Sequence, residues 1–161
     1  VPLAAHLFIF YFGMMSMVTP PVALAGYAAA SIAGTNIMRT SFAAFRFALV
    51  GFTLPYIFVY RPELLMLTQD GGTASPLAMF VPVVIGTLGV LCFASGITGQ
   101  LRGALVLPLR IAMFVAAALL LAPGPSISLG GLPVPVLDAA GALVFGAVLA
   151  INRPPLKEVA G

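Results

Sequence analysis

Charge is scarce in this sequence: acidic and basic residues together make up 7% of the 161 residues, whereas 61% are hydrophobic. A water-soluble domain carries roughly 25% charged residues, and a core of this size could not hide so many apolar side chains. The mean hydropathy of +1.16 agrees with this. We therefore predict an all-α integral membrane protein, because long apolar segments cross a bilayer as helices.

Cysteine and histidine are also nearly absent, since Cys92 and His6 are the sole examples. One cysteine excludes an intrachain disulfide, and the pair excludes a metal cage built from cysteine and histidine. The acidic residues are too few and too far apart in the sequence for an acid–base pair. They are Glu63, Asp70, Asp138 and Glu158. We predict that the chain is not an enzyme and holds no cofactor.

Basic residues number seven and are dispersed, although the formal net charge is +3. Binding to nucleic acid would need them clustered along one face, so we expect no nucleic-acid partner. Their distribution instead predicts a membrane orientation. If the first crossing runs from outside to inside, six of the seven lie on the cytoplasmic side and only Arg61 lies outside, which places the C-terminus in the cytoplasm. The six are Arg39, Arg46, Arg102, Arg110, Arg153 and Lys157.

The apolar stretch from His6 to Gly34 is interrupted by Pro20 and Pro21. Neither proline has an N–H, and each disfavours helical geometry in the residue before it, so a helix that starts at Pro2 must stop near Met17. The alanine-rich run that follows favours a new helix. Each half rises only about 18 to 24 Å, short of the 30 Å or so of a bilayer core, so we predict one discontinuous crossing over residues 2–34.

A helix broken within hydrocarbon persists only where protein or a wet cavity surrounds the freed backbone groups, and such breaks form ion and substrate sites. The Thr19 hydroxyl and the freed carbonyls are oxygen ligands suited to a hard cation such as Na⁺. Alternatively, Ser16 and Thr19 only donate to carbonyls of their own helix, or the two prolines form a loop between separate helices. The candidate ion- and substrate-binding residues are Ser16, Met17, Val18, Thr19, Pro20 and Pro21.

Four further apolar segments bring the prediction to about five crossings. They cover residues 41–60, with a bend near Leu54, and residues 76–98, 104–122 and 136–152. Arg46 and Arg110, near two of the helix starts, are expected to extend toward the membrane surface. Between them we predict a polar loop over 61–75 with a turn at Asp70-Gly71-Gly72, and a Pro/Gly-rich loop over 123–135.

The stretch HLFIFYFGMMSMVTPPVALAGYAAASIAG, with MRTSFAAFR and PYIFVYRP after it, resembles the large fused permease of TRAP transporters of the TAXI type. The resemblance covers residues 1–65, the end of the transport region. Residues 66–161 resemble its variable C-terminal extension of about three helices. It implies an elevator-type secondary transporter of the bacterial or archaeal cytoplasmic membrane, driven by a Na⁺ or H⁺ gradient. An extracytoplasmic TAXI-type binding protein would deliver an organic anion, a carboxylate.

In that family the Thr-Pro-Pro element is the unwound part of a discontinuous helix, so the resemblance assigns the six candidate residues to half of the cation and substrate site. Met17 stands where many relatives have a polar or acidic residue, and Arg61 where Asn is common. Because the chain begins with Val1, we expect the rest of the same permease upstream, with the small membrane subunit. Two alternatives are a non-transporting scaffold or assembly subunit and a polytopic membrane enzyme.

Overall fold

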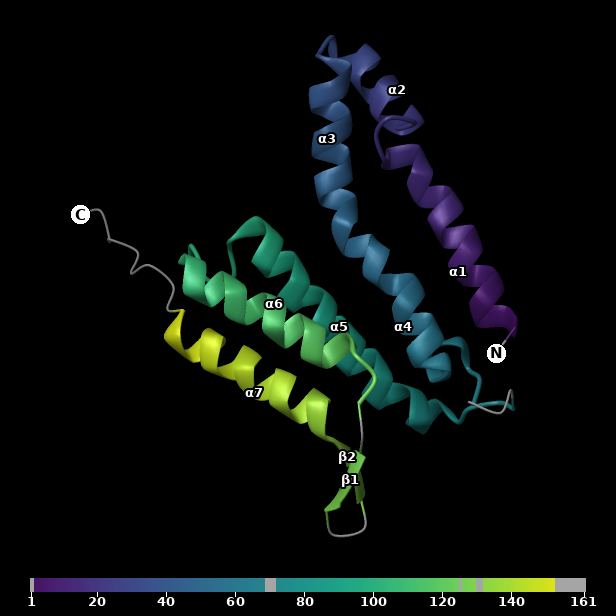
Figure 1. The fold of residues 1–161 in the computed structure, drawn as a ribbon, viewed down its shortest axis with the longest axis vertical. Helices are drawn as coiled ribbons and strands as arrows, with labels where there is room; N and C mark the ends of the chain where they lie inside the picture. Colours follow the sequence, from purple (N-terminus) through teal and green to yellow (C-terminus); the bar gives the residue numbers. More distant parts are fainter. Residues whose placement is uncertain (1, 69–71, 125, 130–131, 153–161) are drawn as a thin grey trace, which may run out of the picture. The chain divides into compact units, whose positions relative to one another are not determined.

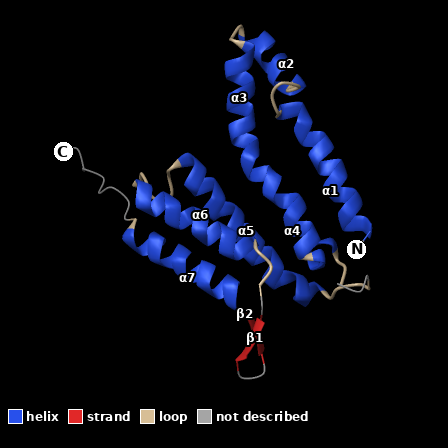
Figure 2. Ribbon diagram, in the orientation of Figure 1, coloured by secondary structure: helices blue, strands red, loops and turns tan. Residues whose placement is uncertain are grey.

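The computed structural model describes residues 2–68, 72–124, 126–129 and 132–152. The chain divides into two compact units, Val1–Pro82 and Val83–Gly161, each of which is described by itself. Helices dominate both units (Figure 2), as the sequence predicts, and one short strand pair is added to them.

The first unit is a helical hairpin in which each arm consists of two helical pieces (Figure 1). The second piece of the first arm continues in the direction of the first piece; the chain then reverses, so that α3 packs against α2 and α4 against α1. The structure thus has the predicted break between two helical pieces, and their joint role as one membrane crossing stays a prediction. The pieces are α1 (Pro2–Met15), α2 (Leu24–Ala33), α3 (Ile37–Ala48) and α4 (Leu54–Tyr60).

The reversal between α2 and α3 is tight because both helix ends are capped. Gly34 ends α2 in the left-handed conformation, with φ of 62°, which glycine adopts without steric cost. Asn36 then starts α3, its side chain accepting a hydrogen bond of 3.0 Å from the backbone N–H of Arg39. Because Asn36 caps the helix, α3 begins at Ile37, four residues before the predicted start at Ser41.

A 3₁₀ turn over Leu49–Thr53 joins α3 to α4 at the position of the predicted bend. Pro55 lies in the first turn of α4, where its lack of an N–H breaks no helical hydrogen bond. After α4, a second 3₁₀ turn covers Pro62–Leu65. Of the predicted turn at Asp70-Gly71-Gly72, Asp70 and Gly71 lie outside the described residues.

Aromatic side chains join α1 to the returning arm. The ring of Phe8 meets Tyr56 edge to face at a centroid distance of 5.3 Å, and Phe12 lies 5.7 Å from Phe52. Pairs in these geometries add about 0.5–1.5 kcal/mol beyond the area they bury. They hold the helix before the break against the second arm.

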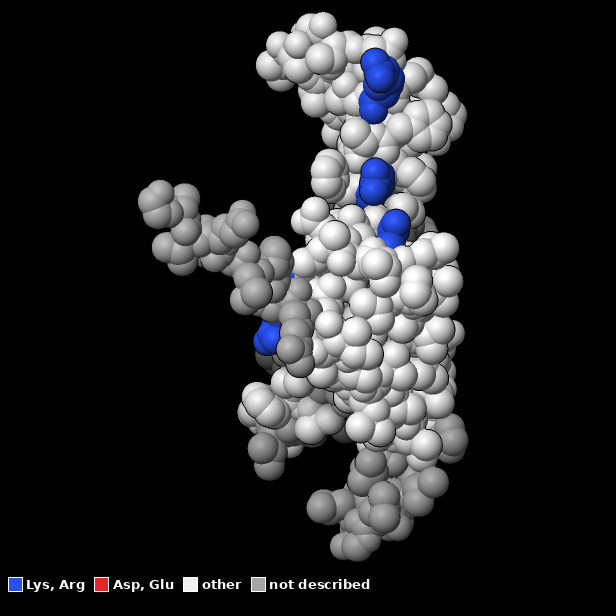
Figure 3. Space-filling model, turned by 90° about the vertical axis from the view of Figure 1, so that its left-hand side faces the viewer, with Lys and Arg blue, Asp and Glu red and all other residues white. Residues whose placement is uncertain are grey.

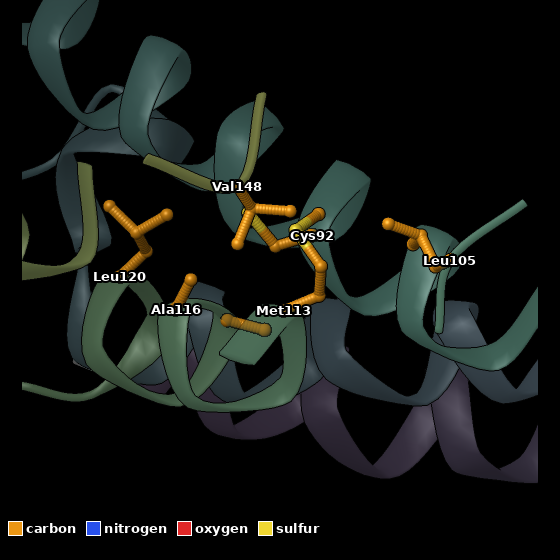
Figure 4. Close-up of a cluster of buried hydrophobic side chains, with 7 residues drawn as sticks. Cys92, Leu105, Met113, Ala116, Leu120 and Val148 are labelled. Atoms are coloured by element: carbon orange, nitrogen blue, oxygen red, sulfur yellow. The ribbon is translucent and has the colours of Figure 1, made fainter. Parts of the chain in front are cut away.

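The second unit packs the part of α5 (Pro76–Thr98) from Val83 onward with α6 (Leu107–Leu121) and α7 (Val136–Ile151). Its core is a stripe of α6, on which Met113, Ala116 and Leu120 are fully buried. Figure 4 shows these side chains with Cys92 of α5 and Val148 of α7. Cys92 is a free thiol with no exposed surface and packs as a small apolar residue, as predicted.

The predicted loop over 123–135 contains a β-hairpin. Its strands are β1 (Ser126–Leu129) and β2 (Leu132–Pro135), paired antiparallel with Leu129 opposite Leu132. Gly130-Gly131 between two short runs with β-branched residues is a hairpin signal in the sequence. Treating the segment only as a loop was therefore incomplete.

The turn between α5 and α6 is held by two side chains from elsewhere in the second unit. Asn152, after α7, accepts from the backbone N–H groups of Arg102 and Gly103 at 3.2 and 3.0 Å and donates to the carbonyl of Ala104 at 3.3 Å. Arg110 donates to the carbonyls at the end of α5, with Nε 3.1 Å from Gly96 O and Nη2 3.2 Å from Ile97 O. Arg110 therefore caps the end of α5. That it extends toward the membrane surface stays a prediction.

Two segments of the described chain are long and apolar enough to cross a membrane, Ile37–Tyr60 and Met79–Thr98. The other apolar helices are shorter: Pro2–Val18, Leu24–Ala33, Leu107–Leu121 and Val136–Ile151. Five crossings and a cytoplasmic C-terminus therefore stay predictions. Arg153 and Lys157, which contribute to the predicted orientation, lie outside the described residues.

Two glycines of α7 provide a test of the packing in the second unit. A Cβ on Gly141 would lie 2.7 Å from Leu120 Cγ and 3.1 Å from the carbonyl oxygen of Ala116, whereas one on Gly146 would meet nothing within 4 Å. Gly141→Ala should lower the free energy of unfolding by about 1–3 kcal/mol. Gly146→Ala should leave it unchanged or raise it by up to about 1 kcal/mol. Thermal unfolding of the detergent-solubilised protein, followed by circular dichroism, compares the two, and equal effects would contradict the packing.

Asn152 provides a second test, because its amide satisfies backbone groups in the turn between α5 and α6. Asn152→Ala leaves these groups without that partner and should lower the free energy of unfolding by about 1–3 kcal/mol. Asn152→Asp keeps the acceptor but loses the donor to Ala104, so its effect should be smaller. Hydrogen exchange read by mass spectrometry should show faster exchange of the Arg102 and Gly103 amides in the alanine variant. Unaltered exchange there would argue against the contact.

Candidate functional site

The break in the first arm lies between the end of α1 at Met15 and the start of α2 at Leu24. A 3₁₀ turn over Ser16–Val18 tightens the end of α1, and Thr19 follows in an extended conformation with φ of −103° and ψ of 119°. The Pro20–Pro21 peptide bond is cis. The chain re-enters helical geometry after a turn closed by the N–H of Ala23, which donates to the carbonyl of Thr19 at 3.0 Å. The helix thus stops at the prolines, as predicted.

Both hydroxyls of the candidate site donate to carbonyls of the helix before them. Ser16 Oγ donates to Gly13 O at 2.6 Å, and Thr19 Oγ1 donates to Met15 O at 2.7 Å. This is the back-bonded arrangement considered from the sequence. A hydroxyl that donates its hydrogen keeps its oxygen lone pairs, so each oxygen can still ligate a cation.

The carbonyls of Met17 and Val18 are left without helical partners at the break. For Val18 O the helical partner would be the N–H of Val22, which is not aligned with it because the chain leaves helical geometry at Thr19. The helical partners of Met17 O would be the nitrogens of Pro20 and Pro21, which carry no hydrogen. Within the described part of the chain, no hydrogen bond to either carbonyl is found. Two backbone oxygens next to Thr19 are therefore available to a ligand.

The six candidate residues differ in exposure. Ser16, Met17 and Pro21 are exposed, whereas Val18, Thr19 and Pro20 are half-buried. The site is therefore open on one side in this structure, and its centre, Thr19, is partly covered by protein. Pro21 also takes part in a contact that the sequence analysis missed: Tyr27 Oη on α2 donates to the Pro21 carbonyl at 2.7 Å.

The start of α2 lacks a side-chain cap. Its first flanking residue, Ala23, is fully buried and has left-handed backbone angles, with φ of 30° and ψ of 44°. Alanine pays roughly 1–2 kcal/mol for this conformation, so the surrounding contacts must impose it. The first turn of α2 contains no acidic residue. Its N–H groups thus offer partial positive charge beside the freed carbonyls of the preceding turn.

The second half-helix is fixed to α3 by a contact that sequence reasoning also missed. Gly26 of α2 and Ser41 of α3 are both buried, and they approach so closely that a Cβ on Gly26 would lie 2.9 Å from Ser41 Cα. A small residue within the expected second half-helix was the available signal, but its partner could not be identified from the sequence.

Titratable ligands are not gathered at the break. No group of three or more His, Cys, Asp or Glu residues that could hold a metal ion occurs among the described residues. His6, the single histidine, lies near the start of α1, whereas the break follows the end of that helix. Its Nδ1 is 2.8 Å from the Pro2 carbonyl oxygen. The oxygens that the described residues offer at the break belong to neutral groups, the hydroxyls and the backbone carbonyls.

An open pocket of about 490 Å³ lies at the other end of α2, lined by Thr35, Asn36, Arg39, Thr40 and Ala43. The hydroxyls of Thr35 and Thr40 are 2.9 Å apart in a hydrogen bond. On the face shown in Figure 3, basic side chains are separated by uncharged ones and no acidic side chain is seen.

The part of the chain that contains this site matches a known family. Residues 1–69 match the family model described as "Tripartite ATP-independent periplasmic transporter, DctM component". Comparison with curated proteins and with solved structures gives no match. The matched family consists of transporter permeases rather than enzymes, and its members are membrane proteins, in agreement with the apolar helices. The first 69 residues, which include the whole of the broken helix, are thus similar to the large permease component of a TRAP transporter.

Proposed function

We propose that this chain forms the C-terminal part of a fused, TAXI-type TRAP permease that imports an organic anion, a carboxylate, using a cation gradient. An extracytoplasmic binding protein would deliver the anion, and the small membrane subunit and the rest of the permease would complete the transporter in the cytoplasmic membrane. The observation that carries the proposal is the broken helix with free carbonyls at Met17 and Val18, within the segment that matches the permease family.

The oxygens at the break suit a hard cation. The Met17 and Val18 carbonyls and the Thr19 hydroxyl belong to consecutive residues, and Ser16 adds a further oxygen. Cation binding would give the two free carbonyls a partner, and would order the turn into which the substrate then binds.

Among coupling ions we favour Na⁺ over H⁺. A proton-coupled site needs a group that titrates, yet Glu63 is the single acidic residue of the matched segment, and it lies in the 3₁₀ turn after α4. His6 lies near the start of α1, distant in sequence from the break. Neutral oxygens bind Na⁺ without a protonation step.

The anion would be attracted by the other side of the break. The first turn of α2 has neither a side-chain cap nor an acidic residue, so its N–H groups and helix dipole favour negative charge. The cation would thus bind at the end of α1 and the carboxylate at the start of α2, on the two sides of the break. Binding of one would favour binding of the other.

A scaffold role is the second candidate, favoured by one observation. Both site hydroxyls already donate to helix carbonyls, as purely structural hydroxyls do. The two candidates differ in their response to cations: a transporter should show a Na⁺-dependent rise in the unfolding temperature of the purified protein, and a scaffold should not.

We expect Thr19→Ala to weaken Na⁺-coupled uptake, because it removes one oxygen ligand. In proteoliposomes containing the full-length protein and its binding protein, the half-saturating Na⁺ concentration should rise by about tenfold, equivalent to about 1.4 kcal/mol. Thr19→Ser keeps the hydroxyl, so its half-saturating Na⁺ concentration should stay close to that of the unmodified protein.

Thr87→Ala is the matched control for this experiment. Thr87 Oγ1 donates to Val83 O at 2.7 Å, four residues back, just as Thr19 Oγ1 donates to Met15 O at 2.7 Å. The control therefore loses the same helical hydrogen bond away from the break. If both alanine variants change the Na⁺ dependence equally, or neither does, Thr19 is not a cation ligand.

A further inference from the structure

The second half-helix is held against α3 by one narrow face. This face consists of three buried residues: Ala23, which precedes α2, and Gly26 and Ala30 within it. Gly26 and Ala30 follow Ala23 by three and seven residues, so all three lie on the same side of the helix. The remaining residues of α2 are exposed, apart from Tyr27, which is half-buried. Within the first unit, α2 thus depends on this face for its position relative to α3 (Figure 1).

Glycine is required at the centre of this face. A Cβ on Gly26 would lie 2.9 Å from Ser41 Cα and 3.0 Å from Ser41 Cβ, and it would come still closer to Ser41 Oγ. The first of these atoms belongs to the backbone of α3, which cannot yield as a flexible side chain would. Any larger residue at position 26 must therefore displace one helix from the other.

Ser41 meets Gly26 through shape alone. Its side chain is fully buried, and among the described residues its hydroxyl oxygen has no hydrogen-bond partner. A buried hydroxyl without a partner is unfavourable, so the hydroxyl group of Ser41 does not stabilise this position. What serine provides here is its small size, which lets the two helices approach.

The contact lies one helical turn from the break. Gly26 is three residues after Ala23, whose N–H closes the turn on the Thr19 carbonyl, and it adjoins Tyr27, whose hydroxyl holds the Pro21 carbonyl. Displacing Gly26 therefore moves both groups that hold the turn.

We propose that Gly26 and Ser41 are positioning residues for the cation site: their close contact fixes the second half-helix on α3 and so sets the geometry of residues 17–21. This inference rests on the proposed function, because it requires a cation to bind at the break. The two residues act through the turn and need not touch the ion.

The test is Na⁺-coupled uptake by Gly26→Ala in the full-length protein, reconstituted with its binding protein. The half-saturating Na⁺ concentration should rise by about fivefold, while the maximal rate at saturating Na⁺ changes by less than about twofold. Loss of folding alone would reduce the amount of active protein, and hence the maximal rate, and leave the Na⁺ dependence unaltered.

Two further variants keep the test decisive. Ser41→Gly removes the opposing Cβ and hydroxyl, and as a single variant it should loosen the contact and also raise the half-saturating Na⁺ concentration. In the double variant Gly26→Ala with Ser41→Gly, the new methyl group no longer meets the serine Cβ and Oγ, and the close approach to the Cα of residue 41 remains. The shift should therefore be smaller than that of Gly26→Ala alone, although not abolished. If Gly26→Ala does not reach the membrane, Ser41→Gly provides the result by itself.

Gly146→Ala is the matched control, since a Cβ there meets nothing within 4 Å. An unchanged Na⁺ dependence in both Gly26→Ala and Ser41→Gly would overturn the inference while leaving the proposed function intact. If uptake by the unmodified protein does not depend on Na⁺, the proposed function fails as stated, and the inference fails with it.

Discussion

Two consecutive prolines, whose nitrogens carry no hydrogen, determine the course of the first arm. Pro20 and Pro21 cannot donate to the carbonyls one turn before them, so α1 must end and the Met17 carbonyl has no helical partner. The chain then becomes extended at Thr19, which leaves the Val18 carbonyl without one as well. In hydrocarbon such groups are costly, so the break requires protein, water or an ion around it. The rest of the first unit provides part of this protein surround. An aromatic ring of α4 packs against α1, before the break, and α3 packs against α2, after it.

The second unit solves a similar problem by other means. Its helix ends are closed by side chains from distant positions: Arg110 satisfies the end of α5, and Asn152 satisfies the following turn. Its core of small and medium residues on α6 gives it a packed interior of its own. One unit leaves backbone groups open where a ligand could use them, whereas the other satisfies backbone groups at its turn. This contrast supports a binding role for the first unit.

Features that depend on the local chain were predictable from the sequence. The stop at the prolines, the end of α2 at Gly34, and the bounds of α5 follow from dihedral preferences and apolar length. The contacts of Gly26 with Ser41 and of Asn152 with the turn after α5 were not, because each joins residues 15 or about 50 positions apart, and hydrophobic periodicity does not identify partners. The hairpin at β1 and β2 belongs to a third class: its signal was local, but the proline and glycine content of the segment obscured it. At the candidate site, the residues could be named from the sequence, but the direction of their hydrogen bonds could not.

Asn152 has a consequence for the order in which this protein is made. Translation proceeds from the N-terminus, so α5, α6 and the turn between them are synthesised before the side chain that satisfies the backbone of that turn. Until residue 152 leaves the ribosome, the N–H groups of Arg102 and Gly103 depend on water, which is present at the membrane surface and absent from its core. If α5 and α6 cross the membrane as predicted, the turn between them must therefore stay at the aqueous boundary until α7 is made.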